Sequence, residues 1–293
     1  MLTRQKVLLA LLDQVKFPLS PTVFVKMVFL LRQETGLKED HTFYDFVPYK
    51  YGPFSFSLYR ELTGMRNHGY VMPGEEYVTL SPATRELTDR TIADLPTTTR
   101  RAVASVVRDY GNKSQRDLLR QVYTRYPWYA TNSELDEFLP ANIPDHPATE
   151  IAVYTVGYEG KSVDSFFDGL LRAGIRTILD VRANPVSRKY GFAKKSLQEI
   201  ANKLGLDYFH LPQLGIPGEQ RTALTSRAAY DELLDRYERE MLPQQPGAFS
   251  RLLGLLGKTA SALLCMEKDV TCCHRGRLAK AVSAHTNLAV VHL

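Results

Sequence analysis

The chain has 293 residues, 44% of them hydrophobic and 24% charged, a composition typical of a globular protein long enough for two domains. No apolar run approaches the ~20 residues that span a bilayer, and residues 1–16 lack the small-residue cleavage site of a secretory signal. Three cysteines, two of them adjacent, do not make a disulfide framework. We therefore expect a cytoplasmic protein with reduced thiols and no membrane partner.

The formal net charge of +5 is unevenly distributed along the chain. Residues 1–150 hold 18 Lys and Arg against 18 Asp and Glu, so their net charge is zero. The remaining 19 basic and 14 acidic residues place the whole excess in residues 151–293. This mild excess permits an anionic partner without proving one.

The first 80 residues have the element order of a winged-helix domain. Residues 2–16 carry apolar side chains at helical spacing, and Ser20-Pro21 is a typical start for a second helix that stops near Gly36. Ser55 can begin a third helix, and residues 70–80 form two short strand-like runs around a Pro-Gly turn. Three helices followed by a two-stranded wing favour a helix-turn-helix variant.

A short motif in this region resembles a known group. Lys50-Tyr51-Gly52-Pro53, after two helices and before a third, is similar to the SocA-like antitoxin (Panacea) and YwgA-type winged-helix-like domains, over roughly residues 5–80. The resemblance implies that the motif lies in the packing between helices. We therefore interpret Tyr51 and Pro53 as core and turn residues without a catalytic role.

Residues 84–126 continue with helical segments that are rich in arginine. They form either a solvated helix face or a surface that contacts phosphates. The candidate nucleic-acid-binding residues are Arg100, Arg101, Arg108, Arg116 and Arg120. Three prolines within residues 140–147 then indicate a linker. We predict a helical winged-helix-like domain at 1–139, a linker at 140–150 and an α/β domain at 151–293.

In the second half, apolar strands alternate with amphipathic helices. Strands are predicted at 151–156, 176–180, 207–211, 260–264 and 288–291, and helices at 162–173, 196–204, 228–241, 248–256 and from about Arg277. This alternation predicts an α/β fold, with a Rossmann-like, mostly parallel sheet flanked by helices.

Reactive side chains gather where these strands end. Gly157-Tyr158-Glu159-Gly160 follows the first strand, and Asp180-Val181-Arg182, with Pro185 and Arg188, the second. His210-Leu211, with Leu214-Gly215, follows the third, and Cys265, Glu267, Cys273, His274 and Arg275 the fourth. Because ligands bind beyond the carboxyl ends of parallel strands, the sequence predicts one site at that edge.

These four segments, in this order and spacing, resemble the family catalogued as domain of unknown function 488, over about residues 152–292. The resemblance implies the fold and the motif set. It brings no reaction with it.

Several of these residues also have purely structural interpretations. Gly157 and Gly160 suit a tight turn, Asp180 and Arg182 can form a structural ion pair, and His210 can be a core histidine. Cys265 is expected to be a buried, inert thiol. The full set of candidates is Glu159, Asp180, Glu267, Cys273 and His274 for catalysis, and Gly157, Tyr158, Arg182, Arg188, His210 and Arg275 for substrate binding.

Cys273 stands out because it precedes a helix, whose N-terminal amides favour a thiolate, and Arg275 adds positive charge. The spacing from Cys to Arg is too short for a phosphatase-like loop. Zinc binding by the cysteines and His274 is disfavoured, since adjacent residues rarely place both side chains on one tetrahedral ion. We predict no metal and no cofactor; helix capping by Cys273-His274-Arg275 remains an alternative.

Two classes of function fit these residues. The first is an enzyme that cleaves or transfers at a glycosidic bond of a nucleotide or nucleic-acid base, with arginines holding an anion, carboxylates as acid and base, and Tyr158 and Tyr208 stacking on a base. The second is a non-enzymatic DNA-binding regulator that senses a small anionic ligand, or an antitoxin-like protein that binds a protein partner through its N-terminal domain. We favour the enzyme; a gene neighbourhood rich in defence or DNA-modification genes would support it.

Overall fold

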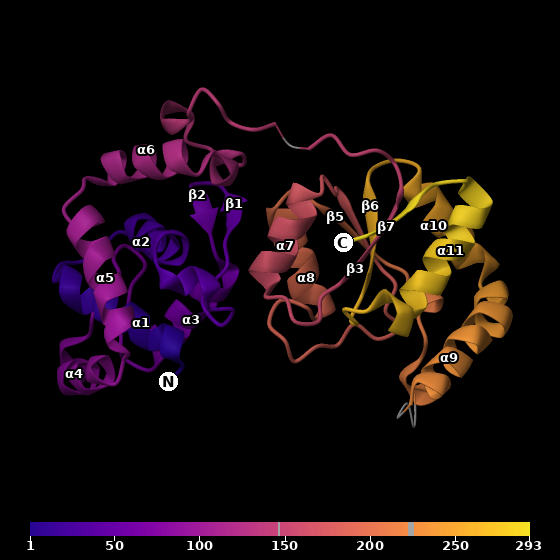
Figure 1. Cartoon of the computed structure of the whole chain (residues 1–293), viewed down its shortest axis with the longest axis horizontal. Helices are drawn as coiled ribbons and strands as arrows, with labels where there is room; N and C mark the ends of the chain where they lie inside the picture. The colour runs from indigo at the N-terminus through magenta and orange to yellow at the C-terminus, as the bar shows by residue number, and fades with distance from the viewer. Residues whose placement is uncertain (146, 222–225) are drawn as a thin grey trace. The chain divides into compact units, whose positions relative to one another are not determined.

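The computed structural model describes residues 1–145, 147–221 and 226–293, and the chain forms two compact units, residues 1–145 and 146–293 (Figure 1). His146, in the predicted linker, lies outside the described residues. No helix in the described ranges is long and apolar enough to cross a membrane.

The first unit is mainly helical, and its helices share a large apolar core cluster. The predicted serine caps are present, because Ser20 accepts a hydrogen bond from the Val23 amide and Ser55 one from the Leu58 amide. The helices are α1 (Thr3–Val15), α2 (Pro21–Glu34), α3 (Phe56–Asn67), α4 (Arg85–Ala93), α5 (Thr97–Tyr110) and α6 (Gln115–Arg125).

The Lys50-Tyr51-Gly52-Pro53 motif lies in a small antiparallel hairpin. Strand β1 (Val47–Tyr49) pairs with β2 (Gly52–Phe54), and Gly52 has a φ of 86°. A Cβ at Gly52 would overlap the ring of Tyr123, so only glycine allows this turn. Pro53 is buried as expected, whereas Tyr51 is half-exposed, because it lies at the turn and not in the core.

The predicted wing at residues 70–80 does not form regular strands. Val71 pairs with Leu80 and Leu19 with Val78 through isolated bridges. The Leu19 bridge joins the segment between α1 and α2 to the residues that follow α3. The three helices come in the predicted order, but the β1-β2 hairpin between α2 and α3 was not predicted, and the wing is reduced to single bridges around the Pro-Gly turn.

A buried lysine links this hairpin to α2. Lys26 is 2% exposed, and its Nζ donates to the Pro53 carbonyl at 3.1 Å. Burial lowers the pKa of Lys26 to about 7, since the charged amine would lose its hydration. An unfolded chain would keep the ordinary pKa near 10.5.

We expect the first unit to become more stable as the pH rises from about 7 toward 9. Over this range the unfolded state keeps a proton on Lys26 that the folded state has lost, so the free energy of unfolding increases, by a few kcal/mol in all, roughly. Lys26→Met should be more stable than the native chain at pH 7 and should lose this slope. Urea unfolding followed by fluorescence of Trp128, the only tryptophan, measures it; an unchanged slope in the variant would contradict it.

The second unit is built on a parallel sheet of five strands in the order β5-β4-β6-β3-β7. The predicted α/β class is confirmed, and each predicted strand is present within two residues. The strands are β3 (Val153–Gly157), β4 (Thr177–Asp180), β5 (Asp207–His210), β6 (Ser261–Cys265) and β7 (Val290–His292).

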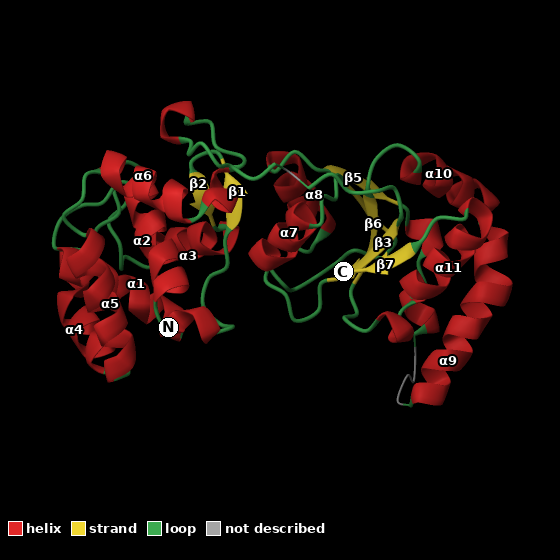
Figure 2. Cartoon of the chain, turned by 45° about the horizontal axis from the view of Figure 1, so that its top comes forward, coloured by secondary structure: helices red, strands yellow, loops and turns green. Residues whose placement is uncertain are grey.

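Helices cover both faces of this sheet. Figure 2 shows α7 (Val163–Arg172) and α8 (Lys194–Lys203) on one face, and α10 (Pro246–Leu256) and α11 (His274–Thr286) on the other. α9 (Arg227–Arg236), which continues as a wider turn to Met241, shares a core cluster with α10 and α11. The helices that follow β4 and β6 thus lie on opposite faces.

Helix α11 begins three residues before the predicted start, at His274. Gly276 makes this region look unsuited to a helix, but the fold requires glycine there. A Cβ at Gly276 would crowd the Val270 carbonyl, 2.9 Å away, and Val270 begins the short turn that precedes α11. Because of this earlier start, Cys273 and His274 lie at the N-terminal end of α11.

Candidate active site

The order in which the chain adds strands to the sheet reverses at its centre, between β4 and β6. After β4 the chain continues to β5 on one side of the sheet, and after β6 it continues to β7 on the other. In open α/β sheets, the crevice between two such neighbouring strands is the usual place for a ligand. Here that crevice lies between the carboxyl ends of β4 and β6.

Side chains at this edge divide between the two faces of the sheet. Successive residues of a strand point to opposite faces, and Asp180 pairs in register with Leu264. Cys265, one residue further along β6, therefore faces the α11 side, while Asp180 faces the α7–α8 side. The candidate residues form two clusters and not the single cluster that we predicted.

The first cluster is a buried ion pair between Asp180 and Arg182. Asp180 is fully buried and accepts hydrogen bonds from Arg182 at 2.8 and 2.6 Å, from the Arg182 amide at 3.1 Å and from the Tyr208 hydroxyl at 2.6 Å. Arg182 also donates to the Phe192 carbonyl. Although burial opposes it, Asp180 raises the pKa of Arg182. Burial and the Asp180 charge raise the pKa of Tyr208, so it stays a donor.

The aromatic rings of this cluster are packed inside the domain. Tyr158 is 5% exposed and stacks on Phe192 with the ring centroids 4.3 Å apart. Its ring is covered by Phe192 and Tyr208 is held by Asp180, so neither is placed to stack on a base. His210 is half-buried, and its Nε2 lies 2.9 Å from the Arg182 carbonyl. These contacts favour the structural interpretation of Asp180, Arg182 and His210.

We expect Asp180→Asn to destabilise the second unit by about 3–5 kcal/mol, because it leaves the Arg182 charge buried without a carboxylate. The same substitution at Asp168, which pairs with the half-exposed Arg172, should cost less than about 1 kcal/mol. Urea unfolding followed by circular dichroism, with hydrogen exchange to separate the units, measures both. A stable Asp180→Asn protein would show that the carboxylate has another role.

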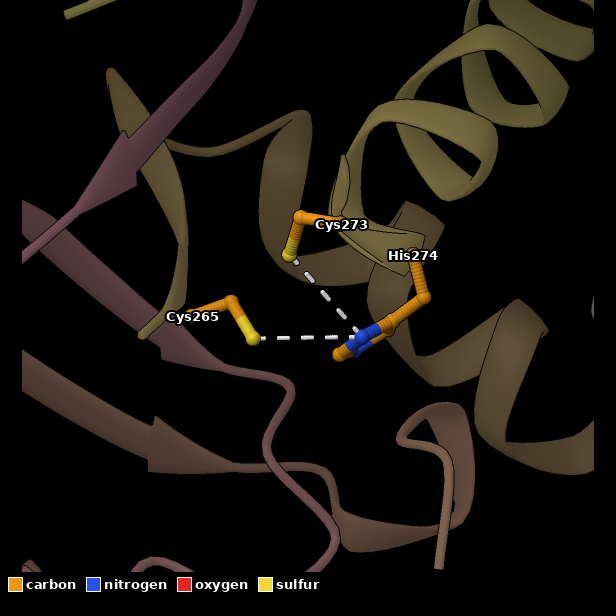
Figure 3. Close-up of side chains that lie close together, drawn as sticks. All are labelled: Cys265, Cys273 and His274. Carbon is orange, nitrogen blue, oxygen red and sulfur yellow. Dashed lines mark hydrogen bonds between the residues drawn. The ribbon is translucent and has the colours of Figure 1, made fainter. Parts of the chain in front are cut away.

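The second cluster joins both buried thiols to a histidine. Cys265 at the end of β6 and Cys273, just before α11, point toward the His274 ring, as Figure 3 shows. The His274 Nδ1 lies 3.8 Å from the Cys265 Sγ and 4.0 Å from the Cys273 Sγ. All three residues are at most 2% exposed.

The adjacent residues Cys273 and His274 reach the same point because the backbone changes between them. Cys273 is extended, with φ −136° and ψ 136°, and His274 is the first residue of α11. This kink turns both side chains inward. Although Cys273 and His274 are adjacent, this geometry lets both reach one ion, contrary to our expectation from the sequence.

The backbone of β4 orients the His274 ring. The His274 Nε2 lies 3.0 Å from the Val181 carbonyl, which can only accept, so Nε2 carries a proton, and in the neutral ring Nδ1 then presents a lone pair to the sulfurs. The N–H of the same peptide group, that of Arg182, donates to Asp180. One peptide group thus contacts both clusters.

The protonation of this cluster is strongly perturbed. The pKa of Cys265 is lowered by its interaction with the Cys273 thiol and by the nearby His274. The pKa of Cys273 is raised by burial. Burial lowers the pKa of His274, but the Cys265 sulfur outweighs it and the pKa rises overall. Burial, followed by the Cys265 charge, raises the pKa of Glu267. The pKa of Cys265, which we expected to be inert, is therefore lowered by its neighbours.

Glu267 is held beside the thiols by its backbone. Its Oε2 lies 3.1 Å from the Cys265 Sγ. The buried guanidinium of Arg275 donates to the carbonyls of Glu267 and, at 3.0 Å, of Lys268. A Cβ at Gly157 would overlap the Glu267 carbonyl, so glycine is needed here for close packing and not to cradle a phosphate. Arg275 and Gly157 thereby position the Glu267 loop.

A pocket of about 340 Å³ opens onto this cluster. The Glu267 Oε1 accepts a hydrogen bond from Arg221 at 3.2 Å. Sequence reasoning missed Arg221 and Tyr230, because they follow the third strand at a distance and belong to no recognisable motif. The pocket is lined by Ile216, Arg221, Tyr230, Leu233, Leu234, Glu267, Cys272, Cys273 and His274.

Two other candidates lie on the surface. Glu159 is exposed and accepts a hydrogen bond from the Lys268 amide at 2.9 Å. Arg188 is exposed in the loop between β4 and α8. Neither lines the described pocket at Glu267.

The fold and the arrangement of the site define an α/β domain with a Rossmann-like parallel sheet. Residues 162–282 match the model of a family described as "Domain of unknown function DUF488". This part of the chain is a DUF488 domain, and the first unit lies outside the match. No curated protein and no solved structure matched the chain.

Proposed function

We propose that the second unit is a hydrolase or transferase that acts on a nucleotide or on a base within nucleic acid, at a glycosidic bond. The observation that carries this proposal is that a partly exposed carboxylate and a guanidinium, those of Glu267 and Arg221, face the same pocket. A volume of about 340 Å³ lies within the usual range for small-molecule sites.

The groups around this pocket fit the parts of such a substrate. Arg221 supplies a positive charge for a phosphate, and the half-buried ring of Tyr230 offers a face for a base. Glu267 supplies a carboxyl group that can donate or accept a proton at the bond that breaks. We therefore propose that Glu267, Arg221 and Tyr230 fill the roles that we predicted from the sequence for Asp180, Arg182 and Tyr158.

We expect Glu267→Gln to lower the rate of product formation at least 100-fold, because it keeps the size of the side chain but removes the acid–base group. Glu199→Gln on α8 is the matched control, since Glu199 is exposed and lies outside the pocket. Nucleotides, NAD, and modified DNA or RNA are incubated with each protein, and products are identified by mass spectrometry. No product with the native chain, or equal rates in both variants, would contradict the proposal.

We further propose that the first unit binds nucleic acid through α5 and α6. Arg100, Arg101 and Arg108 are exposed on α5, and Arg116 and Arg120 are exposed on α6. Arg108 and Arg116 also contact carboxylates, of Asp109 and Glu137. Because the net charge of residues 1–150 is zero, binding should be weak and local to these helices.

Replacing these five arginines by alanine should abolish binding of a labelled duplex at low salt. In the native chain, the logarithm of the affinity should fall with the logarithm of the salt concentration, with a slope of about 0.9 per phosphate contacted. Fluorescence anisotropy over a salt series measures both. Lys194→Ala with Lys195→Ala on α8 controls for general loss of charge. Binding that survives the five substitutions would contradict the role of these arginines, and no duplex binding by the native chain at low salt would instead favour a protein partner for this unit.

A further inference from the structure

The cluster of Cys265, Cys273 and His274 has the composition of a metal site. The two sulfurs and the His274 Nδ1 all lie within 4.8 Å of one another, and all three residues are buried. Two thiols and one imidazole are soft ligands, a set that selects zinc over magnesium or calcium. Figure 3 shows the three side chains directed at a common point.

The distances match those around a tetrahedral zinc ion. Bonds of about 2.3 Å to sulfur and about 2.05 Å to nitrogen place sulfur and nitrogen ligands about 3.6 Å apart. The two sulfur-to-nitrogen distances here are 3.8 and 4.0 Å. Shifts of a few tenths of an ångström would bring both sulfur-to-nitrogen distances to this value.

The histidine is already oriented as a ligand. Its Nε2–H is held by the Val181 carbonyl, which in the neutral ring leaves the Nδ1 lone pair directed at the sulfurs. Metal-binding histidines commonly use a carbonyl or carboxylate in this way to fix the ring and its tautomer. The hydrogen bond that orients a metal-binding histidine is therefore already present in this fold.

The fourth side of the cluster opens onto the pocket. Cys273, His274 and Glu267 line it, and the Glu267 Oε2 lies 3.1 Å from the Cys265 Sγ. Three protein ligands with one further position facing a pocket are the arrangement of catalytic zinc sites, whereas structural sites use four protein ligands.

We propose that Cys265, Cys273 and His274 bind one Zn²⁺ ion, whose fourth position faces Glu267 and the pocket. Both cysteines bind as thiolates, so the two thiol protons are released to solvent and their negative charges balance that of the ion. Zinc binding itself does not depend on the proposed reaction; a role of the ion in that reaction rests on the proposed function.

The test measures zinc in the purified full chain by mass spectrometry of the metal, after dialysis against chelator and reloading with Zn²⁺ alone. We expect one zinc per chain, and most of it should be lost in Cys273→Ser and in His274→Ala. Cys272→Ser is the matched control and should keep its zinc, because the half-buried Cys272 contacts Arg227 and not His274.

A second measurement does not depend on how the variants fold. In the native chain, zinc should slow the alkylation of Cys265 and Cys273 at least tenfold, and chelator should restore the rate, while Cys272 reacts equally with and without the ion. A folded native chain without zinc after reloading, a disulfide between Cys265 and Cys273 as its resting state, or full zinc in Cys273→Ser would overturn the proposal. Zinc without any product would contradict only the proposed reaction; product without zinc would contradict only the metal site.

Discussion

The parallel pairing of β4 with β6 is the constraint on which the arrangement of the second unit depends. Its register sets Asp180 beside Leu264, and the pleat then sends Asp180 and Cys265 to opposite faces of the sheet. The face toward α7 and α8 carries the buried ion pair of Asp180. The face toward α11 carries the two thiols and the imidazole, of which Cys273 and His274 line the pocket. A single residue of slip would exchange the two faces.

The position of Glu267 depends on two residues that do not line its pocket. Arg275 bonds the carbonyls of the loop, and the absence of a side chain at Gly157 gives that loop its room. The backbone around this carboxylate is thus fixed from both sides while its side chain reaches the pocket. Catalytic groups gain from such support, because small displacements of a reacting group cost large factors in rate.

Much of the fold could be predicted from the sequence, because its signals are local. Serine caps, helical spacing and apolar runs predicted α1, α2 and the strands of the sheet within a few residues. The wing at 70–80 was harder, since strand-like composition does not determine how many residues pair. The start of α11 was missed because Gly276, which disfavours helix in isolation, is required by the approach of Val270.

The position of the candidate residues at the strand ends was predictable, but their geometry was not. The sequence located the reactive residues at the strand ends, yet which face each side chain takes depends on the last residue of each strand. Whether Cys273 and His274 converge depends on one change of backbone angle. Arg221 and Tyr230 reach the pocket from a distant segment, and no local pattern marks them.

The peptide group between Val181 and Arg182 couples the hydrogen bonds on the two faces of the sheet. Its carbonyl holds His274 on one side and its N–H holds Asp180 on the other, and a peptide group is rigid and planar. A tilt of this plane that lengthens one hydrogen bond must disturb the other. The energetic effects of substitutions at Asp180 and His274 should therefore be non-additive, although their side chains lie on opposite faces of the sheet.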